Sequence, residues 1–250
     1  MPVKAARVPQ RSLLPYAVLA AIAVALLWAL VASGLWADML RYRKDVVYLI
    51  RQHLVLVVAS GSLAIVCGVA VGIWLSRPWM ARYAQGAIQA VNMVTAIPTL
   101  GKLALMMSLL GIGALPAIVG LWIATLLPII RNTYEGIRAV PPHLLDAARG
   151  MGLDQGEILR RVELPNSLFV IFAGIRTAMA VNVGTAPIAF LIGGGGLGEL
   201  IFTGIDLQET GMMLAGAIPT ALLAVAVDFL FGQAQYWLVP RGVNPLRNVY

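Results

Sequence analysis

The chain has 250 residues, of which 60% are hydrophobic and only 12% are charged, a composition that excludes an ordinary soluble globular protein. The mean hydropathy is +0.86, and the apolar residues come in runs of about 20, the length of a membrane-spanning helix. Such runs also exclude a transmembrane β-barrel, whose strands alternate apolar and polar residues. The basic residues that give the net charge of +7 separate these runs and form no clustered nucleic-acid patch. We therefore expect an all-α, polytopic membrane helical bundle.

Hydropathy predicts about six transmembrane helices. They lie near residues 15–36, 54–76, 86–110, 115–130, 168–192 and 211–231. Only residues 111–114 separate the third span from the fourth, so these two should form a tight helical hairpin. The first run closes with the small residues Ala32-Ser33-Gly34, which would suit a signal peptidase. Because the run is longer than the apolar core of about 7 to 15 residues that signal peptides have, we favour a retained span, with a cleaved signal as the alternative.

The distribution of Lys and Arg gives the orientation. An even number of spans puts both termini on one side, and that side carries twelve Lys and Arg residues against four on the other. Since cytoplasmic loops are the basic ones, both termini should be cytoplasmic. The four exceptions are Arg41, Arg43, Lys44 and Arg51. To account for them, we predict an amphipathic segment over residues 41–53 that lies at the membrane interface before the second span.

We treat residues 1–250 as one transmembrane domain, with a cytoplasmic tail at 1–14 and a long cytoplasmic loop at 131–165. In this loop, Pro141 and Pro142 can begin a short helix, because proline suits the first helical turn. An apolar stripe at three- and four-residue spacing follows. It consists of Leu144, Leu145, Ala148 and Met151.

Gly152 should end this helix in a left-handed turn. Asp154 followed by Glu157 is typical of a capping box, which would open a second short helix toward Leu164. Pro165 either ends that helix or begins the next span. The loop is therefore expected to form two short helices joined by a glycine corner.

One motif in this loop is long and specific. Asp146-Ala147-Ala148 is followed after three residues by Gly152, and after nine more by Val162-Glu163-Leu164-Pro165. This pattern resembles the EAA loop in the permease subunits of ABC importers, with Asp replacing the first Glu and Val replacing Ile. In that family the loop forms the coupling helix, which docks in the ATPase subunit.

The resemblance implies a set of residues that couple the chain to an ATPase. They are Leu144, Leu145, Asp146, Ala147, Ala148, Met151, Gly152, Leu164 and Pro165. The residue types are consistent with docking on a partner protein. The two alanines would let a partner's backbone come close, and the larger apolar side chains would anchor in a groove. The alternative is a loop helix that packs only on its own bundle.

Further passages are most similar to permeases for osmoprotectants such as glycine betaine, choline or carnitine, over roughly residues 45–245. The passages are 52–54, 96–100, 127–133, 173–178, 193–198 and 238–242. Methionine permeases share parts of them, so a methionine or other amino-acid permease is the alternative. The family implies a bacterial inner-membrane protein that works by ATP-driven alternating access.

The chain contains no Walker A motif, so we expect it not to be an enzyme, with ATP and magnesium bound by a separate ABC ATPase subunit and no cofactor here. The resemblance further implies a second permease chain, identical or different, and a periplasmic or lipid-anchored substrate-binding protein. We expect contact with membrane lipid and none with nucleic acid. His53, His143 and Cys67 have no metal-site spacing, so we predict no metal site and disfavour an intramembrane enzyme. An ion-driven secondary transporter would show inverted repeats, and none is evident.

Ionisable residues inside spans are costly unless paired. Arg176 and Asp228 both fall in the cytoplasmic halves of their spans, and we predict that they form an ion pair, which we favour over a role in the pathway. For Lys102 we favour snorkelling toward the outer interface over contact with a substrate carboxylate.

A glycine-rich stretch follows the fifth span. It comprises Gly193, Gly194, Gly195, Gly196 and Gly198. Such a backbone can bend sharply or approach a neighbour closely. The family likeness implies an external gate, and a plain re-entrant turn is the equal alternative.

Overall fold

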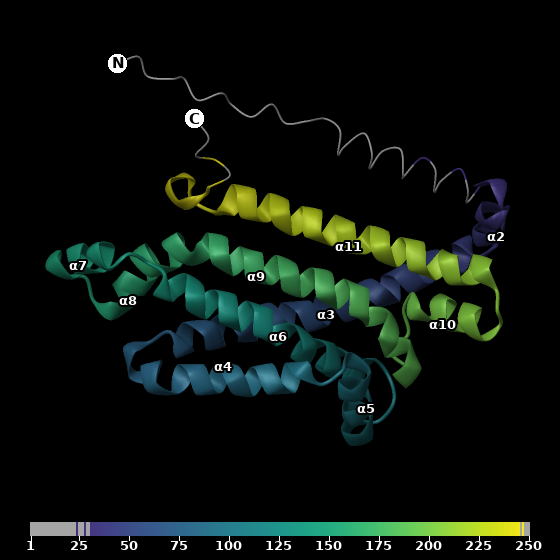
Figure 1. The fold of residues 1–250 in the computed structure, drawn as a ribbon, viewed down its shortest axis with the longest axis horizontal. Helices are drawn as coiled ribbons and strands as arrows, with labels where there is room; N and C mark the ends of the chain where they lie inside the picture. The colour runs from purple at the N-terminus through teal and green to yellow at the C-terminus, as the bar shows by residue number, and fades with distance from the viewer. Residues whose placement is uncertain (1–23, 25–27, 29–30, 246, 248–250) are drawn as a thin grey trace, which may run out of the picture.

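The computed structural model describes residues 24, 28, 31–245 and 247, and their regular secondary structure is helical throughout (Figure 1). The helices, in chain order, are α2 (Leu35–Arg41), α3 (Arg43–Leu75), η1 (Pro78–Met80), α4 (Ala81–Ala96), α5 (Thr99–Leu110), α6 (Ala114–Arg138), α7 (Pro142–Gly150), α8 (Gln155–Ile158), η2 (Leu159–Glu163), α9 (Leu164–Thr185), η3 (Ala186–Ile192), α10 (Gly198–Asp206), α11 (Thr210–Leu238) and η4 (Arg241–Val243). The all-α fold class is thus confirmed. The first predicted span, 15–36, lies largely outside the described residues.

Four helical stretches in the described part of the chain are long and apolar enough to cross a membrane, and a bent pair of helices makes up to five. The four are Arg43–Leu75, Ala114–Arg138, Gln155–Ile192 and Thr210–Leu238. They correspond to the second, fourth, fifth and sixth predicted spans. The chain is therefore a multi-pass helical membrane protein, and the count of about six is approximate.

The third predicted span is not one straight helix, so that prediction is corrected. The chain turns by 90° between the helical segments Pro78–Ala96 and Thr99–Leu110. Pro98 has no N–H group and restricts the residue before it to extended backbone. Ile97 accordingly has a ψ of 131°, which ends α4 and sends α5 off at an angle.

The predicted hairpin between the third and fourth spans is confirmed. Gly111 and Gly113, which join α5 to α6, both have positive φ angles, of 84° and 131°. This conformation favours glycine, because a Cβ atom would clash with the backbone. The two helices pack where Leu103 of α5 lies against Gly120 of α6.

The predicted interfacial segment over 41–53 is wrong. Residues 43–53 form the first turns of α3, which continues for 33 residues to Leu75. At 1.5 Å per residue this helix is about 50 Å long, well beyond the hydrocarbon thickness of about 30 Å. Its basic first turns can therefore stand outside the hydrocarbon without a separate segment, and His53 is fully buried in the bundle.

Helices α11, α9, α6 and α4 lie side by side across the molecule, and α3 crosses against them (Figure 1). The main core joins α3, α6 and α9. It includes Leu56, Ala64, Leu121, Ile129 and Ala178, all buried. Helices α7 and α8 lie at one end of the bundle, called the loop end below. The glycines at 193–198 lie at the other, called the glycine end (Figure 1).

Candidate functional site

Helix α7 presents a mixed surface at the loop end. It begins with Pro142 in its first turn, as predicted. Met151, the residue directly after α7, is 72% exposed, whereas Ala148 within the helix is only 1% exposed. Ala148 therefore packs inside this chain and offers no surface to a partner, contrary to the reason we gave for its small size.

The other α7 residues that we predicted to couple to an ATPase are accessible to different degrees. Leu144 and Leu145 are half-buried, while Asp146 and Ala147 are exposed. The Asp146 carboxylate accepts a hydrogen bond from Arg149 at 2.9 Å. The face available to a partner therefore consists of half-buried leucines, an exposed alanine and the Met151 side chain.

Gly152 forms the predicted corner after α7. It has a φ of 80°, a left-handed conformation that costs other residues about 1 to 2 kcal/mol. The capping box that follows is also confirmed. The Glu157 N–H donates to the Asp154 carboxylate at 2.8 Å, and the Asp154 N–H donates to the Glu157 carboxylate at 3.2 Å. The direction of the chain is thus fixed by backbone geometry on both sides of the corner.

The second short helix does not end at Leu164, so the expectation of a separate helix is corrected. Helix α8 passes through the π-helical turn η2 directly into α9, and the helix is continuous from Gln155 to Ile192. Pro165 lies in the first turn of α9. The wider π turn makes room for the proline ring, which would clash with an α-helical carbonyl. Asn166 donates its side-chain amide to the Val162 carbonyl at 2.7 Å.

Sequence reasoning missed one contact that holds this loop to the bundle. Arg77, just after α3, forms an ion pair with Glu163 at 2.7 Å, and the two side chains are 18% and 14% exposed. Arg77 also donates to the Ile73 carbonyl at 3.2 Å and to the Ser76 hydroxyl at 2.9 Å. Charge-assisted hydrogen bonds of this kind fix orientation. Glu163 belongs to the motif, but nothing in the sequence marked Arg77 as its partner.

A hollow of about 260 Å³ lies beside the same contact. It is lined by Arg77, Pro78, Trp79 and Gln155. Trp79 is exposed, although large aromatic side chains are usually at least partly covered. The hollow therefore enlarges the accessible surface at the loop end beyond α7 itself.

The predicted pair between Arg176 and Asp228 forms. The guanidinium of Arg176 in α9 donates to both carboxylate oxygens of Asp228 in α11, at 3.1 Å and 2.8 Å. It also donates to the side-chain carbonyl of Gln235 at 3.3 Å. Gln235 in turn donates to the Phe169 carbonyl at 2.9 Å. A two-point contact of this geometry is the strong form of the Arg–carboxylate interaction, and it joins α9 to α11.

Lys102 is placed differently from our expectation, so snorkelling is wrong. The residue is 5% exposed, and its ammonium donates to the Thr95 carbonyl at 3.0 Å. Thr95 lies in the last turn of α4, where backbone carbonyls have no partner within the helix. Lys102 thus stabilises the end of α4 across the 90° bend.

The glycine run makes a tightly packed turn against α3. Three of its residues have φ angles between 75° and 87°. They are Gly193, Gly195 and Gly196. The Gly196 N–H donates to the side-chain carbonyl of Gln52 at 3.0 Å. Gly194 and Gly198 lie against the carbonyls of Ala189 and Pro187, so that a Cβ atom at either position would clash with backbone.

Replacing Gly195 by alanine is expected to lower the thermal unfolding temperature of the purified chain. Its φ of 75° would strain the alanine, and the new Cβ atom would lie 2.5 Å from the Gln52 oxygen that holds the turn. The left-handed strain alone costs about 1 to 2 kcal/mol. Gly184→Ala is the control, because nothing lies within 4 Å of its Cβ position. Equal unfolding temperatures for the two variants would contradict the packed turn.

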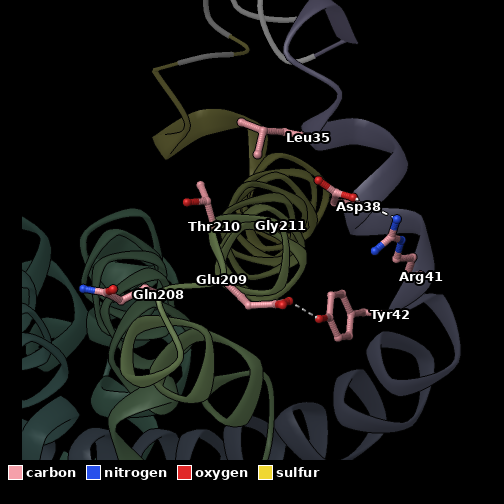
Figure 2. Close-up of a pocket in the computed structure, with 8 residues that line it drawn as sticks. All are labelled: Leu35, Asp38, Arg41, Tyr42, Gln208, Glu209, Thr210 and Gly211. Carbon is pink, nitrogen blue, oxygen red and sulfur yellow. Dashed lines mark hydrogen bonds and ion pairs between the residues drawn. The ribbon is translucent and has the colours of Figure 1, made fainter.

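A second hollow, of about 330 Å³, opens at the glycine end (Figure 2). It is lined by Leu35, Asp38, Arg41, Tyr42, Gln208, Glu209, Thr210 and Gly211. The Tyr42 hydroxyl donates to the Glu209 carboxylate at 2.6 Å, a hydrogen bond that raises the pKa of Tyr42 above its usual value of 10.0. The bond ties the start of α3 to the turn before α11.

The described chain is thus a multi-pass helical bundle with a bent third span and a helical loop between the fourth and fifth spans. Residues 64–242 match the family described as "binding-protein-dependent transport system inner membrane component", and the chain belongs to this family. It is accordingly an inner-membrane permease component of a binding-protein-dependent transport system.

Several curated permeases are similar over most of their length. The osmoprotectant import permease protein OsmY of Salmonella typhimurium is 47% identical over 210 residues, covering 84% of this chain and 89% of that protein. The carnitine transport permease protein OpuCB of Listeria monocytogenes is 40% identical, over 78% of this chain and 89% of its own length. The choline permease protein OpuBB of Bacillus subtilis is 38% identical, over 82% and 94% respectively.

A solved structure has the same fold. An inward-facing structure of the MetNI methionine ABC transporter superposes with a TM-score of 0.70 at 23% identity, covering 82% of this chain and 98% of that one. At this level of identity the likeness concerns the fold alone.

Proposed function

We propose that this chain is the transmembrane subunit of an ABC importer that moves an osmoprotectant, such as glycine betaine, choline or carnitine, by ATP-driven alternating access. The observation that carries the proposal is the identity of 37–47% to permeases named for these solutes, over most of their length. The EAA-like loop supports the dependence on ATP, because its helix, corner and cap present a defined surface at one end of the bundle, on which an ATPase subunit can dock.

The loop end is the docking site of a separate ATPase subunit in this proposal. Met151, directly after α7, is the most exposed apolar anchor there, and Leu144 and Leu145 add two half-buried apolar side chains on α7. The partner binds ATP and magnesium, and this chain needs no cofactor and is not itself an enzyme. The ion pair between Arg77 and Glu163 carries force from the docked loop to the end of α3.

The loop end is cytoplasmic in this proposal, and so are both termini. The support is the excess of Lys and Arg near the span ends on that side, twelve against four, which follows the positive-inside rule. The hollow between α2 and the start of α11 (Figure 2) then faces outward, toward a periplasmic or lipid-anchored binding protein. A second permease chain, identical or different, completes the pathway.

Co-purification tests the assignment. Gly152→Asp is expected to abolish recovery of an ATPase with the tagged chain from its native membrane, because a side chain at a φ of 80° strains the corner and adds a carboxylate beside the α7 surface. The control is Gly150→Ala, since nothing lies within 4 Å of that Cβ position and its backbone is helical. The control should recover the ATPase as wild type does.

The other results have clear consequences. A wild-type chain that purifies without an ATPase and still transports would overturn the proposal in favour of a secondary transporter. If a binding protein co-purifies, its affinity for glycine betaine, choline and carnitine should exceed its affinity for methionine. The reverse order would make the chain an amino-acid permease.

The glycine run is proposed as an outer gate. Gly196 and its neighbours close over α3 through the hydrogen bond to Gln52 at 3.0 Å. Gly195→Ala should therefore reduce uptake more strongly than Gly184→Ala at equal amounts of chain in the membrane. Equal uptake by the two variants would contradict the gate and would mean that the glycine run is a plain re-entrant turn.

A further inference from the structure

Helix α4 carries a stripe of amide side chains on its outer surface. Gln85, Gln89 and Asn92 are spaced by four and three residues, which places them on one face of a helix. All three side chains are exposed. Two charged residues of the neighbouring helix α6, Arg131 and Glu135, are exposed beside them.

These residues surround a common hollow of about 110 Å³ between α4 and α6. It is lined by Gln85, Ile88, Gln89, Asn92, Leu127, Arg131 and Glu135. Within the part of the chain that the structure describes, the five polar side chains among them form no hydrogen bond or ion pair. Their amide and charged groups are therefore available to something outside this chain.

The opposite edge of the bundle has a different chemistry. Helices α4 and α11 lie at opposite edges of the row of helices in Figure 1. The exposed residues over 221–230 of α11 are all apolar. They are Ala221, Leu222, Val225, Ala226, Phe229 and Leu230. The Asp228 side chain in the same stretch is 44% exposed, but it is paired with Arg176. This surface therefore presents no unpaired polar group to lipid, which offers no hydrogen-bond partner.

The amide stripe does not suit lipid. An amide group without a partner costs about 4 to 8 kcal/mol on transfer from water to a hydrocarbon. Gln89 and Asn92 lie inside the third predicted span, where polar residues face a water-filled cavity or another protein group. Arg131 and Glu135 lie near the loop end of α6 and continue the stripe toward the cytoplasmic side. A stripe with both signs of charge and three neutral amides can solvate a small polar solute that carries either charge.

We propose that the face formed by Gln85, Gln89 and Asn92 of α4, with Arg131 and Glu135 of α6, lines the water-filled passage for the transported solute. This inference rests on the proposed transport function and deepens it by assigning the surface that the solute meets. The occupant is water together with a small hydrophilic solute, and α11 is the surface that faces lipid. The passage then lies between this edge of the bundle and the second permease chain.

Cysteine accessibility tests the assignment in the full chain within its native membrane. The sole cysteine, Cys67, is first replaced in Cys67→Ala. Gln89→Cys and Asn92→Cys are then compared with Val225→Cys and Phe229→Cys, whose native residues are 69% and 61% exposed. The probe is the quaternary ammonium reagent trimethylammonium-ethyl methanethiosulfonate. It reacts with the thiolate, which forms in water and not in hydrocarbon.

We expect labelling at residues 89 and 92 and none at 225 and 229, with uptake of radiolabelled choline or glycine betaine lost on labelling at 89. Unlabelled stripe positions would mean that a second chain or lipid covers this face, and labelling at all four positions would remove the difference between the two edges. Either result overturns the inference. Retained uptake after complete labelling at 89 does so as well.

The test separates this inference from the proposed function. Labelling requires neither the ATPase nor a known substrate. Suppose that the ATPase fails to co-purify but the stripe is labelled and α11 is not. The passage is then supported, and the assignment to an ABC importer is wrong. If the ATPase co-purifies but the stripe stays unlabelled, the importer stands and the passage lies elsewhere.

Discussion

Reversing the charge of either Arg176 or Asp228 is expected to remove most of the folded chain from the membrane. Each single reversal, Arg176→Asp or Asp228→Arg, places two like charges where a two-point ion pair now joins α9 to α11 at 2.8 Å and 3.1 Å. An unpaired charge in the centre of a span costs about 2.5 to 3.5 kcal/mol on insertion scales. A cost of ~2.7 kcal/mol corresponds to about a 100-fold change in an equilibrium constant.

The double variant Arg176→Asp with Asp228→Arg should recover part of this loss, because opposite charges again face each other. Recovery will be incomplete, since the exchange removes the hydrogen bond that Arg176 donates to Gln235 at 3.3 Å. The measurement is the amount of monodisperse chain extracted from the membrane. Glu199→Arg serves as a control for a charge change alone, because Glu199 is exposed. A double variant no better than the worse single variant would show that the pair does not act as a unit.

Gly72→Ala is expected to separate α3 from α6 and to lower stability by about 1 to 3 kcal/mol, the usual range for overpacking a tight interior. A Cβ atom at Gly72 would lie 2.5 Å from the Thr133 Cβ and 2.9 Å from the Ile130 carbonyl oxygen. The carbonyl belongs to the α6 backbone and cannot rotate away as a side chain would. The two helices must therefore move apart to admit one methyl group.

Gly86→Ala in α4 is the matched control, because nothing lies within 4 Å of its Cβ position. Replacing a helical glycine by alanine without a clash is favourable by roughly 0.5 to 1 kcal/mol, so this variant should be as stable as wild type or slightly more so. Thermal unfolding of both variants in the same detergent gives the comparison. If Gly72→Ala unfolds at the wild-type temperature, the close approach of α3 and α6 is not needed for stability.

Local patterns were sufficient to predict the helical class, four of the spans, the hairpin between α5 and α6, and the corner at Gly152. Each depends on residues close together in the chain, such as an apolar run, a glycine with positive φ or a capping box. The ion pair of Arg176 with Asp228 was also predictable, because a charge in a span requires a partner and the alternatives were few.

The features that sequence reasoning missed depend on contacts between residues far apart in the chain, or on which of two backbone conformations forms at a proline. Arg77 and Glu163 lie 86 positions apart, and many other basic residues were equally plausible partners. The 90° turn at residues 97–98 and the π turn before Pro165 are opposite responses to proline, one breaking the helix and the other widening it. Burial of Ala148 depended on how α7 lies against the bundle.

The continuity of the helix from Gln155 to Ile192 has a mechanical meaning. Its central part, α9, has 22 residues and is about 33 Å long at 1.5 Å per residue. The π turn η2 connects it to the loop-end corner, and the 3-10 helix η3 connects it to the glycine run. A flexible linker at Leu164 would absorb any displacement of α8. A continuous helix absorbs less of it, so a tilt imposed at Gln155 is expected to shift Ile192 in the opposite direction if the pivot lies between them. A single continuous helix can thus transmit a displacement of the loop end on one side of the membrane to the glycine end on the other side.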